Sequence, residues 1–344
     1  MRNTFSAGFL VGALFLPSAA SAWWDEGHMR IAAMAYELLT PAARTEANRL
    51  TRLNPKYAEW ASAVPATPDG SPKDVDRYTF IRAAVWADDI KEMKEYRDAS
   101  SAAKDAPTHP NAGQNIGYSD LLIHAYWHYK DIPFSNDGSP LADADAVNAL
   151  TQIKMFTAAL PKTAGQSDDV RSYDLVWLLH LLGDVHQPLH ATARFTKELR
   201  LKYQLAGTPD LGDRGGNDAT VSPATGEIIP LHAYWDGLFG GYSTVSGAIF
   251  DSFVVKKVGG EARNISKLLP PTPESAAVAD PELWLEESYQ IARKYAYAEP
   301  VLSAKGVAEL GRQYETDARN AAETQISLAG ARLANVINAV LDAQ

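Results

Sequence analysis

Two His–Asp pairs in this chain share the same four-residue spacing. His180 and Asp184 lie in an almost entirely apolar segment, and His232 and Asp236 repeat the spacing in the sequence Leu-His-Ala-Tyr-Trp-Asp. Residues four apart lie on one face of an α-helix, one turn from each other. An ionised carboxylate on so apolar a helix is unfavourable unless it is paired or bound to a metal. The spacing therefore indicates a metal site built from imidazole and carboxylate groups.

Further histidines and aspartates occur within a few residues of a tryptophan or of a helix-ending proline; they are His28, Asp88, His128 and His190. The chain has no cysteine, and imidazole and carboxylate ligands without thiolates suit zinc with open coordination positions. One His-x-x-x-Asp pair alone is more often a surface ion pair or a hydrogen-bonded buried histidine. Two pairs together with these additional residues favour the metal site.

The first 22 residues have the pattern of a cleaved signal peptide. Arg2 precedes an apolar run over residues 7–16, and the small residues Ala-Ser-Ala at 20–22 form a cleavage site. The apolar run is too short to span a bilayer, and the alternative is a buried N-terminal helix. We expect export to the periplasm or the medium, with Trp23 as the mature N terminus.

Helical periodicity dominates the rest of the chain, in which apolar residues make up 46% and charged residues 22%. Apolar positions from Ile31 to Leu39 follow helical spacing, and Thr40 with Pro41 is typical of the next helix start. We expect further helices over 141–160, 167–186, 281–298 and 306–342, and loops over 64–77, 100–118 and 204–230.

Period-two alternation is confined to short pieces near residues 218–230, and no internal repeat or domain linker is evident. The pattern therefore predicts an all-α fold, with residues 23–344 as a single compact multi-helix domain containing long loops and at most a small β-hairpin. The formal charge of −10 is unusual for a protein that binds nucleic acid. A cluster of bound divalent cations would reverse the sign of the charge locally.

The segment from His180 to His190, His-Leu-Leu-Gly-Asp-Val-His-Gln-Pro-Leu-His, resembles the core motif H-x-x-G-D-x-x-Q-P-L-H of a known enzyme family. This is the S1/P1 nuclease family, the zinc-dependent single-strand-specific nucleases of fungi, plants and bacteria. Other matches follow in the family's order: Trp23 with Gly27-His28, Trp86-Ala87-Asp88, His128, Gly215-Gly216-Asn217, His232 with Trp235-Asp236, Trp284 with Glu287-Ser288, and residues 332–335. The resemblance covers essentially the whole mature chain and implies the helical fold of zinc phospholipase C and the single-strand nucleases.

The resemblance implies three zinc ions. The implied ligands are Asp88, His128, His180 and Asp184 for the first ion; the amino group and carbonyl oxygen of Trp23 with His28 and Asp184 for the second; and His190, His232 and Asp236 for the third. Asp184 would then bridge the first two ions. Because the α-amino group of Trp23 is free only after cleavage, removal of the signal peptide would activate the enzyme.

The implied activity is endonucleolytic hydrolysis of single-stranded DNA and RNA with 5′-phosphate products, and 3′-mononucleotides would be further substrates. Two close zinc ions lower the pKa of a shared water towards neutrality and so supply hydroxide. The third ion would stabilise the leaving 3′ oxygen. The resemblance implies Asp88, Lys91 and Asp184 as the catalytic residues.

Four residues match substrate-binding positions of the family: Lys91, Tyr129, Asp131 and Asn217. Lys91 would neutralise the phosphate, although a solvated lysine on a helix face is an equally good interpretation. Tyr129 would stack on a base, Asp131 would bond the base edge, and a paired base does not offer its face for stacking. These roles would explain a preference for single strands.

The chain departs from the family in having Trp24 after the first tryptophan and in lacking disulfides. Three histidines fall outside the implied ligand sets. We expect His186 to be partly exposed or to contact a metal-binding side chain without binding the metal itself. His109 should be solvated. His124 should be buried in the core or should likewise contact a metal-binding side chain.

The closest alternative is a bacterial zinc phospholipase C, in which the first tryptophan and histidine are further apart and the last ligand is a glutamate rather than an aspartate such as Asp236. The others are an exported zinc-binding protein without catalysis, which would have closed coordination spheres, and a helical interaction module. We expect a monomer with no stable membrane association.

Overall fold

The computed structural model describes residues 23–67, 73–240, 244–258 and 261–342. The predicted signal peptide, residues 1–22, lies outside the described residues. Among the helices that are described, none combines the length and the apolar character needed to cross a membrane.

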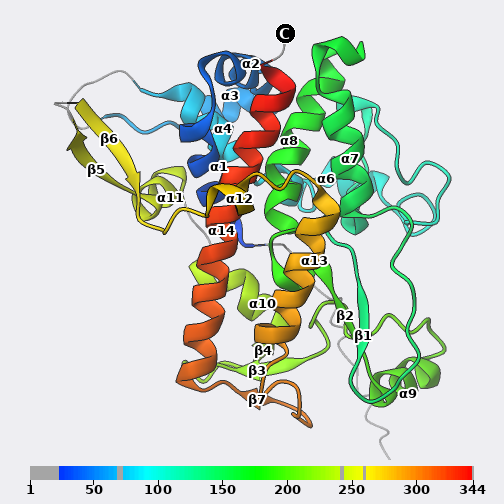
Figure 1. Cartoon of the computed structure of the whole chain (residues 1–344). Helices are drawn as coiled ribbons and strands as arrows, with labels where there is room; N and C mark the ends of the chain where they lie inside the picture. The colour runs from blue at the N-terminus through cyan, green and yellow to red at the C-terminus, as the bar shows by residue number, and fades with distance from the viewer. Residues whose placement is uncertain (1–22, 68–72, 241–243, 259–260, 343–344) are drawn as a thin grey trace, which may run out of the picture.

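The predicted fold class is confirmed, because the described chain is mainly helical (Figure 1). The α-helices are α1 (Asp25–Leu38), α2 (Pro41–Thr51), α3 (Tyr57–Ser62), α4 (Val75–Ala83), α5 (Trp86–Asp89), α6 (Lys94–Ala99), α7 (Ala149–Ala159), α8 (Asp168–Asp184), α9 (Lys197–Ala206), α10 (Leu231–Asp236), α11 (Val245–Ser252), α12 (Pro273–Ala276), α13 (Pro281–Ile291) and α14 (Arg312–Leu341). Two short 3-10 helices also matter for the site: η2 (Ala125–His128) and η4 (Pro188–Ala191).

The strands are short and form three small sheets, where the sequence predicted at most one hairpin. They are β1 (Pro133–Ser135), β2 (Ala193–Phe195), β3 (Thr220–Ser222), β4 (Ile229–Pro230), β5 (Phe253–Val258), β6 (Glu261–Ser266) and β7 (Ala308–Glu309). β1 pairs with β2 in parallel, β3 lies between β4 and β7, and β5 and β6 form an antiparallel hairpin. The first of these sheets joins the segments that follow η2 and η4.

Helix α8 runs through the centre of the molecule beside α14 and α1 (Figure 1). The hydroxyl of Ser167 accepts a hydrogen bond from the Val170 amide and caps its N terminus. Every residue of α8 from Arg171 to Asp184 is buried. The helix therefore places the His180–Asp184 pair in the core, and the pair is not a surface ion pair.

Aromatic side chains fix the elements around α8. Trp177 of α8 makes edge-to-face contacts with Trp86 of α5 and Trp127 of η2, with ring centroids 6.2 and 5.0 Å apart. Phe156 of α7 lies against both Trp127 and Trp177. Edge-to-face packing of buried rings is orientation-dependent. The cluster therefore sets the positions of the two segments that carry Asp88 and His128.

Two helix starts differ from the expectation. Helix α7 begins at Ala149 rather than near 141, because Asn148 forms a capping box with Thr151. Helix α14 begins at Arg312 rather than 306, because residues 308–309 pair with β3 instead. By contrast, Thr40 caps α2 with Pro41 in its first turn, as the sequence predicted.

Candidate metal centre

The structure brings together all eight side chains that the sequence proposed as metal ligands. They come from α1 (His28), α5 (Asp88), η2 (His128), α8 (His180 and Asp184), η4 (His190) and α10 (His232 and Asp236). These eight side chains are buried or nearly so. They form two neighbouring groups, which we call the Asp184 group and the His190 group.

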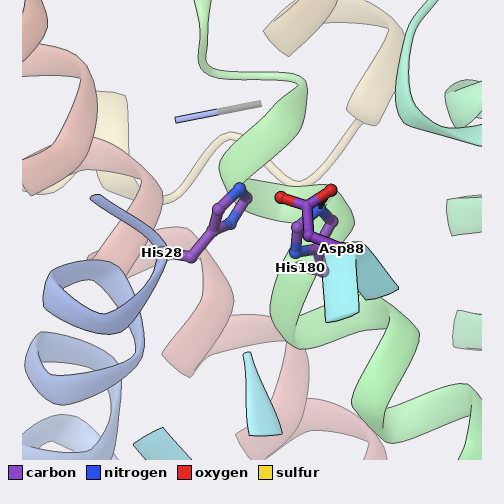
Figure 2. Close-up of side chains that lie close together, drawn as sticks. All are labelled: His28, Asp88 and His180. Carbon is purple, nitrogen blue, oxygen red and sulfur yellow. Dashed lines mark ion pairs between the residues drawn. The ribbon is translucent and has the colours of Figure 1, made fainter. Parts of the chain in front are cut away.

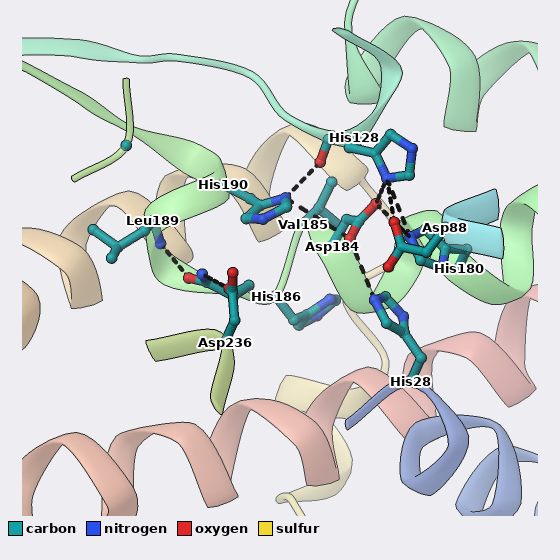
Figure 3. Close-up of polar contacts among 12 residues, drawn as sticks. His28, Asp88, His128, His180, Asp184, Val185, His186, Leu189, His190 and Asp236 are labelled. Atoms are coloured by element: carbon teal, nitrogen blue, oxygen red, sulfur yellow. Dashed lines mark hydrogen bonds and ion pairs between the residues drawn. The ribbon is translucent and has the colours of Figure 1, made fainter. Parts of the chain in front are cut away.

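The Asp184 group contains His28, Asp88, His128, His180 and Asp184 itself (Figures 2 and 3). Asp184 Oδ2 lies 3.0 Å from His128 Nδ1 and 3.4 Å from His180 Nε2, whereas Oδ1 lies 3.5 Å from His28 Nε2. The two oxygens of one carboxylate therefore face different histidines. Asp88 Oδ1 lies 3.7 Å from His180 Nε2.

The His190 group consists of His190, His232 and Asp236. His232 Nε2 lies 3.2 Å from His190 Nε2 and 3.4 Å from Asp236 Oδ2. The two groups are adjacent, since His190 Nδ1 lies 3.7 Å from Asp184 Oδ1 (Figure 3). The arrangement is two neighbouring carboxylate–histidine clusters that meet where His190 contacts Asp184.

Three histidines are oriented by backbone carbonyls that accept hydrogen bonds from Nδ1. The bonds are His180 to Ala84 (2.7 Å), His190 to His128 (2.8 Å) and His232 to Gly215 (2.8 Å). A hydrogen bond of this kind fixes the tautomer and leaves the Nε2 lone pair for a ligand. All three Nε2 atoms point into the groups described above.

The donor set fits metal cations rather than a hydrogen-bonded network. The Nε2 atoms of His190 and His232 face each other although both rings carry their proton on Nδ1, so neither has a proton to offer the other. Neither ring nitrogen of His28 has a hydrogen-bond partner, and neither does Asp184 Oδ1. Buried polar atoms without partners are rare and call for an explanation, and a bound cation between them provides one.

The electrostatics point the same way. Burial lowers the pKa of His180 to about 3 and of His232 to about 4, which keeps the imidazoles in the neutral form that metals bind. Burial, with the nearby charge of Asp88, raises the pKa of Asp184 and of Asp236 above the ordinary range for a carboxyl group. Bound cations would stabilise the ionised form of these carboxylates, which burial otherwise disfavours.

Lys91 is buried rather than solvated. It lies one turn after Asp88, and its Nζ is 2.6 Å from Asp88 Oδ1. The interpretation of Lys91 as a solvated lysine on a helix face is therefore wrong. The ammonium group lies at the edge of the Asp184 group, next to a proposed ligand.

Trp23 is anchored beside both groups. Its side chain is fully buried and packs over Gly27 and against the ring of Phe239, at 5.4 Å between ring centroids. The amide of the next residue, Trp24, donates to the carbonyl of Asp236 over 3.2 Å. These contacts hold the start of the described chain next to His28 and to the end of α10.

Of the proposed substrate-binding residues, Tyr129 and Asp131 line one cavity together with Asp145, Asn148 and Phe195. Its volume is about 60 Å³. Burial and the charge of Asp213 raise the pKa of Asp131 to about 8, so its carboxyl group is largely protonated at neutral pH. A protonated carboxyl can donate a hydrogen bond as well as accept one.

Asn217 does not line that cavity. Its Nδ2 donates to the Arg214 carbonyl over 2.8 Å, within the turn that also provides the Gly215 carbonyl for His232. The structure thus gives Asn217 a contact that holds this turn.

Two supporting residues were not identified from the sequence, although both lie in the motif that carried the resemblance. Gln187 donates to Asp236 Oδ1 and accepts from the Leu189 amide, which links α10 to η4. A Cβ atom on Gly183 would lie 2.7 Å from His28 Nδ1, so this position must lack a side chain for His28 to approach α8. The fixed Gly and Gln of the motif were the available signal.

We expect Gly183→Ala to lower activity roughly tenfold to a hundredfold, because displaced ligands lose metal affinity on that scale. Activity and bound metal should be measured together. Gly330→Ala is the matched control. Its Cβ would lie 2.9 Å from Met34 Cβ, so the crowding falls on a part of α1 that is six residues from His28. It should lower thermal stability while retaining metal. Full activity and metal in Gly183→Ala would show that His28 does not need this approach.

The three remaining histidines are placed as follows. His186 is fully buried, not partly exposed; Nδ1 contacts the Leu182 carbonyl, and Nε2 lies 3.0 Å from Arg332 of α14. His124 is buried as expected, stacked on Trp127 with ring centroids 3.6 Å apart. His109 lies in a loop and is partly exposed.

Comparisons with known proteins agree with the geometry. The S1/P1 Nuclease family model matches residues 23–342. "Endonuclease 3" of Arabidopsis thaliana is 25% identical over 272 residues, which cover 75% of this chain and 76% of that protein. "Endonuclease 5" of the same plant is 26% identical over 202 residues, which cover 55% of this chain and 59% of that protein. The chain, with its two buried histidine–carboxylate groups, belongs to the S1/P1 nuclease family.

Proposed function

We propose that this chain is an exported endonuclease with three zinc ions, which hydrolyses single-stranded DNA and RNA to 5′-phosphate products and also acts on 3′-mononucleotides. Residues 1–22 would be removed on export, and residues 23–344 would form one catalytic domain. The observation that carries the proposal is the pair of adjacent buried His/Asp groups in a chain of this family. The names of the two plant relatives support an endonuclease.

The proposal places three cations among these residues. The proposed ligands are Asp88, His128, His180 and Asp184 for one ion, His28, Asp184 and the backbone of Trp23 for the second, and His190, His232 and Asp236 for the third. Bound zinc would supply Lewis-acid stabilisation of the phosphoryl oxygens and would lower the pKa of a water molecule. The absence of cysteine leaves no thiolate alternative.

The protein's own groups would position the reaction. The two oxygens of Asp184 face His28 on one side and His128 with His180 on the other, which suits a carboxylate shared between neighbouring ions. Lys91 Nζ, held at Asp88, would offset the negative charge that develops on the phosphate. Desolvation strengthens both effects, because charges interact more strongly in a buried site than in water.

The preference for single strands is attributed to the side chains of Tyr129 and Asp131, against which a base would rest, because the cavity of about 60 Å³ beside them is too small to enclose a base. Stacking of a base on an aromatic ring contributes roughly 1–3 kcal/mol, and a base held in a duplex is not available for it. Tyr129 directly follows the proposed ligand His128, and Asp131 lies two residues further along. A base bound there would therefore bring its own phosphate close to the Asp184 group.

The decisive experiment compares single-stranded and duplex DNA of equal length, digested by protein that begins at Trp23. We expect faster cleavage of the single strand, 5′-phosphate ends and dependence on added zinc after chelation. Equal rates on both forms would contradict the role of Tyr129 and Asp131. Intact DNA from a protein that holds zinc would contradict the nuclease proposal, and phosphatidylcholine hydrolysis would then favour the phospholipase alternative.

A further inference from the structure

The β5–β6 hairpin exposes an unusual concentration of apolar side chains. Of the 18 large hydrophobic residues exposed in the described chain, six lie between residues 250 and 269: Phe250, Val254, Val255, Val258, Ile265 and Leu269. Val254, Val258 and Ile265, on the strands, are 39%, 43% and 37% exposed, and Phe250 and Leu269, which flank the hairpin, are 73% and 89% exposed. Isolated exposed apolar residues need no explanation, but a contiguous group marks an interaction surface.

The same segment is locally basic in an acidic protein. Lys256, Lys257, Arg263 and Lys267 fall within it, against two acidic residues, Asp251 and Glu261, whereas the whole chain has a formal charge of −10. Lys256 and Lys257 are exposed. Phe250 and Lys267 form a cation–π contact, with Nζ 4.3 Å from the ring centroid. The hairpin therefore combines positive charge with apolar surface.

The strand register places both kinds of side chain on one face. Val254 pairs with Ile265 and Lys256 pairs with Arg263, and side chains of alternate residues share a face. Val254, Lys256, Val258, Arg263 and Ile265, together with Glu261 opposite Val258, thus form what we call the hairpin face. Lys256 and Arg263 outnumber Glu261 on this face, so its formal charge is positive, which suits an anionic surface.

Two residues on the opposite face of the hairpin, Phe253 and Asn264, contact the body of the molecule. Phe253 is buried under Arg77 of α4, and Asn264 Nδ2 donates to Glu37 Oε1 at the end of α1 over 3.0 Å. Figure 1 shows β5 and β6 at the edge of the molecule, away from α8 and α13. Along α1, His28 and Glu37 are nine residues apart, about 14 Å at the rise of an α-helix. Changes in the hairpin face therefore leave the metal centre undisturbed.

We propose that the hairpin face binds reversibly to the surface of an anionic phospholipid bilayer. Aliphatic side chains enter the boundary between headgroups and acyl chains, while lysine and arginine contact the lipid phosphates. The acidic remainder of the protein is repelled by the same surface, so the hairpin is directed towards it.

Two other occupants fit less well. A nucleic-acid strand is bound through basic side chains and stacking aromatics, and the valines and isoleucine of this face provide no stacking. A second copy related by two-fold symmetry would place the same patch against itself, which would bring Lys256 and Arg263 of both copies together. Only the bilayer uses the apolar and the basic residues at once.

The test is co-sedimentation of protein beginning at Trp23 with phosphatidylcholine vesicles, with and without phosphatidylglycerol. We expect binding only to the anionic vesicles, weakening as salt rises. Each lysine near such a surface strengthens binding roughly fivefold, so Lys256→Glu should weaken it by at least that factor. Val254→Thr with Val258→Thr should weaken it several-fold without a change in charge.

Two controls carry the same charge change as Lys256→Glu. Lys104→Glu changes an exposed lysine outside the hairpin, and Lys257→Glu changes the neighbour on the opposite face of β5. Both should bind better than Lys256→Glu, and all variants should cleave a short soluble oligonucleotide at the parent rate. Equal binding to both vesicle types, no binding, or unchanged binding of Lys256→Glu would overturn the proposal. A rise in KM for long single strands alone would reassign the face to nucleic acid.

Discussion

Replacing Asp184 by asparagine is expected to lower kcat/KM on single-stranded DNA by at least about a thousandfold, equivalent to roughly 4 kcal/mol of transition-state stabilisation. Asp184 is the only proposed ligand common to two ions, and its two oxygens face histidines on opposite sides. The amide is neutral and a poorer ligand, so both positions would lose affinity. The measurement is steady-state kinetics together with the metal content of the purified variant.

The matched control is Asp174→Asn on the same helix. Asp174 is also fully buried in α8, and burial raises its pKa to about 8, so its carboxyl group is already largely neutral at pH 7. An asparagine there should leave activity and bound metal near the parent level. If Asp184→Asn kept its metal and most of its activity, the assignment of Asp184 as a shared ligand would be wrong.

Removal of metal is expected to abolish activity and to lower the melting temperature by on the order of 10 °C. A cation bound only by the folded state, at a concentration a thousand times its Kd, stabilises that state by about 4 kcal/mol, and about 1 kcal/mol shifts Tm by a few degrees in a large domain. Without the cation, His28 and Asp184 Oδ1 remain buried without hydrogen-bond partners. Differential scanning calorimetry with and without chelator measures the shift.

Readdition of zinc should restore both the melting temperature and the activity. The Asp184→Asn variant serves as the control, because its chelator-induced shift should be smaller than that of the parent. A chelated protein that melts at the parent temperature would show that the two His/Asp groups are stable without cations. In that case the unpartnered ring nitrogens of His28 would need another explanation.

Local sequence signals predicted some elements closely. The expected helix over 167–186 is observed as α8, Asp168–Asp184, because Ser167 caps its start and an apolar run follows. The starts of α7 and α14 were missed by several residues. In α14 the cause was tertiary, since residues 308–309 pair with β3, a strand more than 80 residues earlier in the chain. Periodicity within a window does not contain such a contact.

The residue types of the candidate site could be predicted from the sequence, but the backbone groups that orient these side chains could not. Spacing and the resemblance identified the side chains that gather in the two groups, yet the carbonyls that orient their rings belong to Ala84, His128 and Gly215. Every residue has a carbonyl group, so composition and spacing do not indicate which carbonyls accept hydrogen bonds from the histidine rings. The burial of Lys91 was equally undetermined, because its spacing predicts the contact with Asp88 but not the packing of His128 and His180 close to it.

The sequence by itself determined the helical class, the family and the identity of the side chains in both groups, because each of these follows from residue type and order. Only the tertiary structure decided that His28 and Asp88 meet His180 in the core, that His186 contacts Arg332 rather than solvent, and that the β5–β6 hairpin presents a basic and apolar face. The physical reason is that burial and hydrogen-bond partnership depend on segments far apart in the chain. Those segments come together only when α1, α8 and α14 pack against one another.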